Sequence, residues 1–145
     1  LTAMPELTGV TVRLHLPPAD APCLAHGTHQ QIGRVVKMVL ENAVKFSAEE
    51  KAIQITLAQS PQHATLTITD RGEGFPPELA REIFRPFTTT NLLHHSRGTG
   101  LSLALASAIV ETYGGTIRAE SLGPGQGASF IIELPTALSP SPSVV

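Results

Sequence analysis

The sequence predicts an α+β fold, a two-layer α/β sandwich in which a mixed sheet of about five strands packs against three helices. Two observations carry this prediction. Apolar residues recur at helical spacing in one long segment, residues 29–46, and apolar and polar residues alternate in three short ones, residues 10–16, 53–57 and 65–69. The predicted order of elements is β-α-β-β-α-α-β-β, and most strands are followed by a partner that can pair as a hairpin. We therefore expect the helices on one face of the sheet.

The first half of the chain is expected to form three strands and one amphipathic helix. Residues 10–16 alternate between apolar and polar side chains, which is typical of a half-buried strand. Over residues 29–46 the apolar residues recur every three or four positions and fall on one helical face. Two further alternating segments, 53–57 and 65–69, are joined by residues 60–63, which resemble a hairpin connection.

The second half of the chain predicts a short helix, a long loop, a second long helix and two strands. Two prolines open the short helix from Glu78 to Phe84. Residues 85–99 show no periodicity, and loops of about 15 residues are usually functional or mobile. The apolar composition of residues 100–113 predicts a mostly buried helix, closed by a glycine pair. Residues 116–121 and 129–134 are the last strands.

Length and composition predict one domain and exclude several classes of protein. We expect residues 1–136 to form this domain and the Pro/Ser-rich residues 137–145 to form a tail or linker. Charged residues make up 15% of the chain and the net charge is −2, so nucleic acid is not an expected partner. The apolar runs are too short to span a membrane, and direct membrane contact is not expected. One cysteine fits a reducing compartment, and the start without methionine resembles a cut from a longer protein.

The polar side of the first long helix carries Glu41, Asn42 and Lys45, which are neighbours at helical spacing. One interpretation is a solvated face with a Glu–Lys pair. However, asparagine is a poor helix former, so its place in mid-helix needs a reason. An amide oxygen beside a carboxylate and an ammonium group can bind hydrated Mg²⁺ and phosphates.

Asp70 follows the third strand in phase with Leu66 and Ile68, so its side chain is predicted to point to the buried face. A buried carboxylate needs a partner, and a purine amino group would provide one. Gly72 and Gly74 come directly after it and permit a sharp bend and close approach of a ligand. The alternative is an ordinary Asp-Gly turn with a surface aspartate.

A second glycine-rich string, Arg97 to Leu103, stands where the long loop meets the second long helix. Glycine-rich backbone that leads into a helix N-terminus favours a phosphate site. The alternative is a flexible loop whose glycines serve only to start a buried helix. Because no Walker lysine follows the glycines, the string is not a P-loop.

Four strings occur in an order that resembles the ATP-binding domain of sensor histidine kinases, in the GHKL superfamily. Residues 41–47 are similar to the N box, residues 70–74 to the first glycine box, residues 83–87 to the F box and residues 97–103 to the second glycine box. The resemblance runs from about His29 to Pro135 and includes the C-terminal strands.

This resemblance implies the Bergerat-type ATP-binding fold, with ATP and Mg²⁺ held between the glycine boxes and a lid. Asn42 would carry Mg²⁺, Lys45 would meet phosphate, and Glu41 would assist the target histidine, which makes these three the implied catalytic residues. Asp70 would bind adenine, while Phe84 and Phe87 would anchor the first edge of the lid. The implied nucleotide-binding residues are Asn42, Lys45, Phe46, Asp70, Gly72, Gly74, Phe84, Phe87, Gly98, Thr99, Gly100 and Leu101.

The chain departs from the family pattern in two ways. Ser102 stands where a glycine is common, and none of the six histidines precedes an acidic residue as a phosphoacceptor would. The resemblance therefore implies a target histidine on the protein's own dimerisation domain, outside this chain, and a response regulator downstream. It implies a cytoplasmic domain whether or not the parent protein is membrane-anchored. The alternatives are a serine kinase of the anti-sigma type, a degenerate ATP-sensing module without catalysis, and an ATPase clamp like those of gyrase or heat-shock chaperones.

Overall fold

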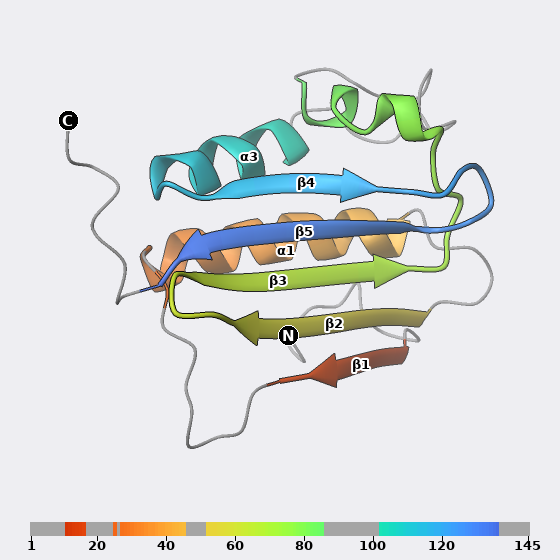
Figure 1. Ribbon diagram of the computed structural model, residues 1–145. Helices are drawn as coiled ribbons and strands as arrows, with labels where there is room; N and C mark the ends of the chain where they lie inside the picture. The colour runs from red at the N-terminus through yellow and green to blue at the C-terminus, as the bar shows by residue number, and fades with distance from the viewer. Residues whose placement is uncertain (1–10, 17–24, 26, 46–51, 86–101, 137–145) are drawn as a thin grey trace.

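The computed structural model describes residues 11–16, 25, 27–45, 52–85 and 102–136. Within these residues, five strands form one sheet in the order β1-β2-β3-β5-β4 (Figure 1). Their bounds are β1 Thr11–His15, β2 Ala52–Gln59, β3 His63–Asp70, β4 Thr116–Glu120 and β5 Ala128–Pro135.

The sheet is mixed, as predicted. β1 pairs with β2 in parallel, and the β2–β3, β3–β5 and β4–β5 pairs are antiparallel. The hairpin predicted at residues 60–63 is confirmed, because the Ser60 backbone N–H donates to the His63 carbonyl and the His63 N–H donates to Ser60 Oγ. The last strand, β5, lies between β3 and β4, so its strand neighbour β3 is far away in sequence.

Two α-helices cover one face of this sheet, α1 (His29–Lys45) and α3 (Ser102–Thr112) (Figure 1). The predicted apolar face of α1 is confirmed, since Val35, Val39, Leu40 and Ala43 are fully buried. These side chains pack in one core with apolar residues of β2, β3 and β5 and with one side of α3. The predicted two-layer α/β sandwich is therefore confirmed.

The third predicted helix, Glu78 to Phe84, is present as two short 3-10 helices, η2 (Pro77–Leu79) and η3 (Glu82–Phe84). Pro77 is the first residue of η2, a position whose N–H takes no part in the hydrogen bonds of the helix, so proline is tolerated there. The prediction that α3 is mostly buried is wrong for one side of the helix. Leu105 is 43% exposed, while Leu103, Ala106 and Val110 are buried.

The two α-helices run in opposite directions, and the contact between the start of α1 and the end of α3 shows this. Thr28 caps α1 through a hydrogen bond from the Gln31 backbone N–H to Thr28 Oγ1 (3.1 Å), and the same hydroxyl lies 3.3 Å from Tyr113 Oη just beyond α3. After its last residue, Thr112, α3 is closed by a Schellman cap, in which Gly114 has a φ of +78° and Gly115 N donates to Val110 O at 3.0 Å. The end of α1 therefore lies beside the start of α3. In the part of the chain described, every helix falls short of the length and apolarity needed to cross a membrane.

Candidate functional site

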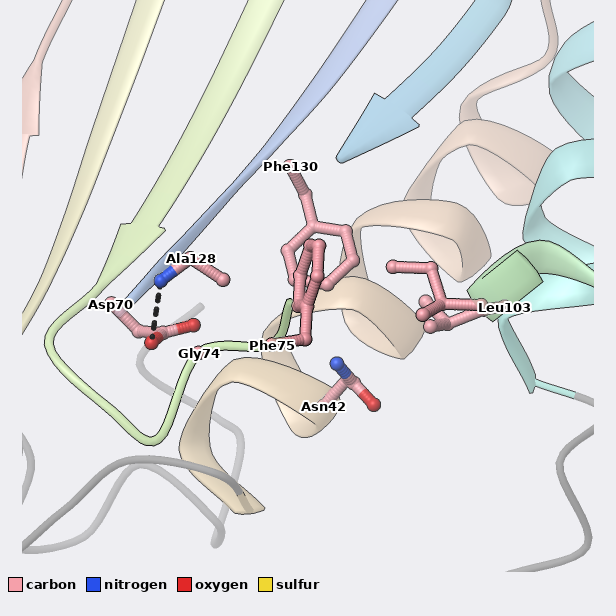
Figure 2. A pocket seen from close by; sticks show the side chains of 8 residues that line it. Asn42, Asp70, Gly74, Phe75, Leu103, Ala128 and Phe130 are labelled. Atoms are coloured by element: carbon pink, nitrogen blue, oxygen red, sulfur yellow. Dashed lines mark hydrogen bonds between the residues drawn. The ribbon is translucent and has the colours of Figure 1, made fainter. Parts of the chain in front are cut away.

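A pocket lies where the end of α1, the start of α3, the end of β3 and the start of β5 converge (Figure 2). Polar groups stand at two of its sides, Asp70 from the end of β3 and Asn42 from α1. Between them the wall is apolar and includes the aromatic rings of Phe75 and Phe130. The described residues that line the pocket are Asn42, Asp70, Gly74, Phe75, Ile83, Leu103, Ala128 and Phe130.

The carboxylate of Asp70 is buried, with 4% of the residue exposed, as its phase in the strand predicts. Its Oδ1 atom accepts two backbone hydrogen bonds, from Gly72 N at 2.8 Å and from Ala128 N at 3.3 Å. Burial raises the pKa of Asp70 from 3.8 to about 6, and these two N–H donors act in the opposite direction. The site thus contains a desolvated carboxylate whose other oxygen receives neither of these bonds.

The loop after Asp70 bends back at Gly74, whose φ is +62°. A Cβ at this position would stand 2.5 Å from the Gly123 carbonyl oxygen and 2.7 Å from Ser121 Oγ. Both the backbone angle and the close packing therefore require glycine here. Gly72 is buried, and its carbonyl accepts a hydrogen bond from Gly127 N at 3.1 Å.

The predicted triad on α1 is only partly described. Asn42 lines the pocket, and Glu41 lies on the same turn, 3.8 Å from Lys37 Nζ in a pair exposed to solvent. The Glu–Lys pair of this face is thus made with Lys37. Lys45 is the last residue of α1, and its side chain lies outside what the structure describes.

The donor set at this place fits Mg²⁺ held together with phosphates. In proteins Mg²⁺ keeps several waters and often binds one or two protein oxygens plus phosphate oxygens. Asn42 brings one side-chain amide to the pocket from α1, and its oxygen, which Figure 2 shows turned away from the aromatic rings, is the atom that would bind Mg²⁺. Among the described residues, no group of three or more His, Cys, Asp or Glu side chains forms a cage of protein ligands alone.

Phe84, predicted from the F box, packs behind the pocket and is not one of its described lining residues. Its ring meets that of Phe130 edge-on, with centroids 6.3 Å apart and planes at 88°. It therefore supports a pocket wall, while its neighbour Ile83 lines the pocket. The remaining predicted residues lie outside the described part of the chain: Phe46, Phe87, Gly98, Thr99, Gly100 and Leu101.

Sequence reasoning missed the apolar half of the pocket. Phe75, Ile83, Leu103, Ala128 and Phe130 come from four separate segments, and each reads in the sequence as an ordinary core residue. A usable signal existed for two of them, since Phe75 directly follows Gly74 and Leu103 is the last residue of the second glycine string. Phe130 and Ala128 face the pocket only because β5 lies beside β3.

Taken together, the pocket offers apolar walls with aromatic edges, one buried hydrogen-bond acceptor and one amide. Such a combination is typical of sites that hold a flat, largely apolar ring with a polar edge. A carboxylate whose burial is already costly gains from a ligand that donates a hydrogen bond to it. The site therefore suits a heteroaromatic ring that carries an amino group.

Comparison with known sequences and structures agrees with this geometry. A sequence model of the family described as histidine kinase-, DNA gyrase B- and HSP90-like ATPases matches residues 27–138. This chain belongs to that ATPase family.

The similar proteins indicate the branch of the family. MprB of Mycobacterium avium (strain 104), a signal transduction histidine-protein kinase/phosphatase, is 32% identical over 126 residues, which are 84% of this chain and 24% of MprB. The sensor histidine kinase TmoS of Ectopseudomonas mendocina is 35% identical over 132 residues, 87% of this chain and 13% of TmoS. The chain thus spans a quarter or less of either relative.

Solved structures give the same result. A mycobacterial sensor histidine kinase MprB matches with a TM-score of 0.77 at 30% identity, over 89% of this chain and 83% of that one. The nucleotide-free catalytic domain of histidine kinase ThkA matches with a TM-score of 0.76 at 25% identity, over 93% of this chain and 86% of that one. The chain is an ATP-binding catalytic domain of the sensor histidine kinase type. The anti-sigma, degenerate and clamp alternatives are not favoured.

Proposed function

We propose that this chain binds ATP in the pocket beside Asp70 and supplies the γ-phosphoryl group to a histidine on the dimerisation domain of its own full-length protein. The observation that carries the proposal is the placement of a buried carboxylate and an amide at two sides of an apolar pocket. The names of the relatives, all sensor kinases, support the same activity.

Adenine occupies the apolar part of the pocket in this proposal. Both backbone bonds to Asp70 go to Oδ1, so Oδ2 is left to accept a hydrogen bond from the exocyclic amino group of adenine. Phe75 and Leu103 cover the faces of the ring and exclude water. Gly72 and Gly74 bring the backbone close to the base without a side chain in the way.

The phosphate end of the nucleotide lies toward the end of α1. Asn42 holds Mg²⁺ there, and Mg²⁺ neutralises charge on the phosphate oxygens when bound. Lys45 pairs with phosphate, and Glu41 orients the target imidazole and takes its proton. In the transfer, the bond between the γ-phosphorus and the bridging oxygen breaks, a bond from the histidine nitrogen to phosphorus forms, and ADP leaves.

The remaining roles in this proposal fall on residues outside the described ranges. Phe46 and Phe87 belong to the nucleotide-binding set, and Phe87 together with Phe84 anchors the first edge of the lid. Gly98, Thr99, Gly100 and Leu101 contact the phosphates at the start of α3. We also propose that residues 1–136 form the domain and 137–145 a tail or linker. The phosphohistidine passes its phosphoryl group to a response regulator, and the reaction takes place in the cytoplasm.

Two experiments test this function. Thermal unfolding with and without ATP and Mg²⁺ is expected to show a rise in Tm of roughly 5–10 °C at a ligand concentration about 100-fold above Kd. Incubation of the chain with labelled ATP and the purified dimerisation domain is expected to yield acid-labile phosphate on that domain. A Tm that no nucleotide changes, in a folded protein, contradicts the proposal.

A further inference from the structure

The turn between β4 and β5 lies against the loop that follows Asp70. Figure 1 shows the connection after β4 on the same side of the sheet as the chain that leaves β3. Two backbone hydrogen bonds join them, from Gly125 N to Glu73 O at 2.6 Å and from Gly127 N to Gly72 O at 3.1 Å. The β4–β5 turn is thus docked along the glycine-rich loop at one side of the pocket.

Ser121, the first residue after β4, makes a further set of contacts across this junction. Its Oγ accepts hydrogen bonds from Phe75 N and from Gly123 N, both at 3.2 Å. Two carbonyl oxygens lie within reach of its single proton, Gly127 O at 2.7 Å and Gly123 O at 3.2 Å, and the shorter distance assigns the donated bond to Gly127 O. One hydroxyl can donate once and accept twice, so this side chain uses its full hydrogen-bonding capacity.

The backbone around Ser121 is closely packed. A Cβ on Gly74 would come within 2.7 Å of Ser121 Oγ, and a Cβ on Gly127, whose φ is +71°, would come within 2.3 Å of the Asp70 carbonyl oxygen. Both glycines thus let two backbone segments approach more closely than side chains would permit. Ser121 sits between these segments.

The two segments that Ser121 joins are the same two that hold Asp70. One segment runs from Gly72, whose N–H donates to Asp70 Oδ1, to Phe75, which bonds to Ser121. The other runs from Gly127, which bonds to Ser121, to Ala128, whose N–H donates to Asp70 Oδ1. The bonds of Ser121 to both segments therefore hold Gly72 N and Ala128 N in place relative to each other, and both of these groups donate to Asp70 Oδ1.

We propose that Ser121 is a positioning residue for nucleotide binding, because its hydroxyl locks the two backbone segments that orient the Asp70 carboxylate and place Phe75 in the pocket wall. The nucleotide part of this inference rests on the proposed function. The effect on Asp70 can be measured in the ligand-free protein.

A purely structural role for Ser121 would give a different result. A serine that only stabilised a turn would change the melting temperature without altering the titration of Asp70. The strand neighbours of Asp70, Ile53 and Ala128, are uncharged, and so is Asn42, which lines the same pocket from α1. The charged residues of its own loop are Arg71 and Glu73, which the substitution leaves in place. A change in the Asp70 titration therefore reports on its N–H donors.

The test compares Ser121→Ala, Ser121→Thr and Ser129→Ala in the 145-residue chain. Ser129 is the matched control, because its Oγ lies 2.9 Å from Thr69 Oγ1 between the same two strands but does not touch the loop. The Asp70 carboxyl is titrated by ¹³C NMR without ligand, and ATP affinity is measured by calorimetry. Thermal unfolding checks that each variant is folded.

In Ser121→Ala the two N–H groups are expected to bond the Asp70 carboxylate less well, so the Asp70 carboxyl is expected to titrate at a pH higher by about 0.5 unit. The same variant is expected to bind ATP about three- to tenfold more weakly. Ser121→Thr is expected to restore both values, and Ser129→Ala to leave both unchanged. An unshifted Asp70 titration in folded Ser121→Ala, or an equal shift in Ser129→Ala, overturns the proposal. Absence of ATP binding by the unaltered chain counts against the proposed function instead, and the titration still decides the role of Ser121.

Discussion

Asp70 and Ala128 are joined across the ends of two neighbouring strands, 58 residues apart in sequence, by a 3.3 Å hydrogen bond from the Ala128 backbone N–H to Asp70 Oδ1 (Figure 2). Gly72 N donates to the same oxygen at 2.8 Å. The carboxylate is therefore held by one oxygen, and its orientation is set by backbone N–H groups from the loop after β3 and from the first residue of β5.

This arrangement makes Asp70→Asn a sharp test of adenine recognition. The asparagine carbonyl oxygen is expected to take the place of Oδ1, which puts the NH₂ group where Oδ2 stands. Two donors then face each other when an adenine amino group enters the pocket, so ATP affinity is expected to fall by at least 30-fold, about 2 kcal/mol. Calorimetry measures this loss. An affinity within threefold of that of the unaltered chain contradicts the assignment.

Stability and ATP binding are expected to respond to pH in opposite directions. The pKa of Asp70 is raised to about 6 by burial, above its value of 3.8 when unfolded, so the folded state favours the protonated form. Its contribution to stability is fully present below about pH 3.8 and is lost as the pH rises through about 6, by at most about 3 kcal/mol. ATP needs the ionised form and is expected to bind more weakly as the pH falls through about 6.

Asp70→Asn is also the reference that isolates this titration. The difference in free energy of urea unfolding between the unaltered chain and Asp70→Asn, measured from pH 4 to pH 8, removes the contribution of other groups. The unaltered chain is expected to lose stability relative to the variant as the pH rises. A difference that is flat over this range shows that Asp70 does not carry the effect.

Asn42→Ala separates the two ends of the nucleotide. Adenosine affinity is expected to change less than twofold, because Asp70 and the apolar wall remain. The gain in ATP affinity on adding Mg²⁺, and phosphoryl transfer, are expected to be lost. Calorimetry with and without Mg²⁺ measures the first. Gln30→Ala, on an exposed position of α1, is the control, and an equal loss of adenosine and Mg²⁺-dependent binding rejects the separation.

Two glycine-to-alanine substitutions are expected to have opposite effects on the free energy of unfolding. Gly74 has a φ of +62° and a crowded Cβ position, so Gly74→Ala is expected to cost about 1–3 kcal/mol and to weaken ATP binding. Gly33 lies within α1, where a Cβ meets nothing within 4 Å, so Gly33→Ala is expected to add about 0.5–1 kcal/mol. Urea unfolding of both variants measures these changes, and a common sign would show that local backbone geometry does not control them.

Local patterns were sufficient to predict the parts of the fold that depend on a single segment. The period of α1 identified its buried face, and the period of β3 placed Asp70 inward, because in both cases the side chain direction follows from position in the element. The Ser60–His63 hairpin was predictable for the same reason. Four separate segments meet at the apolar wall of the pocket, and Phe130 reaches it because β5 lies between β3 and β4. Periodicity carries no information on that neighbour relation.

Two predictions on helices differed from the structure for reasons of packing. The composition of residues 78–84 predicted one short α-helix, but the segment forms two 3-10 helices. In the second of these, the Arg85 N–H donates to Glu82 O. α3 is apolar on most sides, yet only one side faces the core, which leaves Leu105 at the surface. The composition of α3 thus predicted burial on most sides, whereas in the two-layer arrangement only the side that faces the core is buried.

The parallel pairing of β1 with β2 has a consequence for the order in which the sheet opens. Thr11 pairs with Ala52, so 40 residues that include all of α1 lie between the two partners, whereas β2 and β3 are joined by a turn of three residues between Gln59 and His63. Long closures form late in folding and short ones early. Among the strands that the structure describes, β1 also lies at an edge and is bonded to β2 alone. Its amide protons are therefore expected to exchange with solvent through a local detachment of lower free energy, while those of the central strands β3 and β5 exchange only when the domain unfolds.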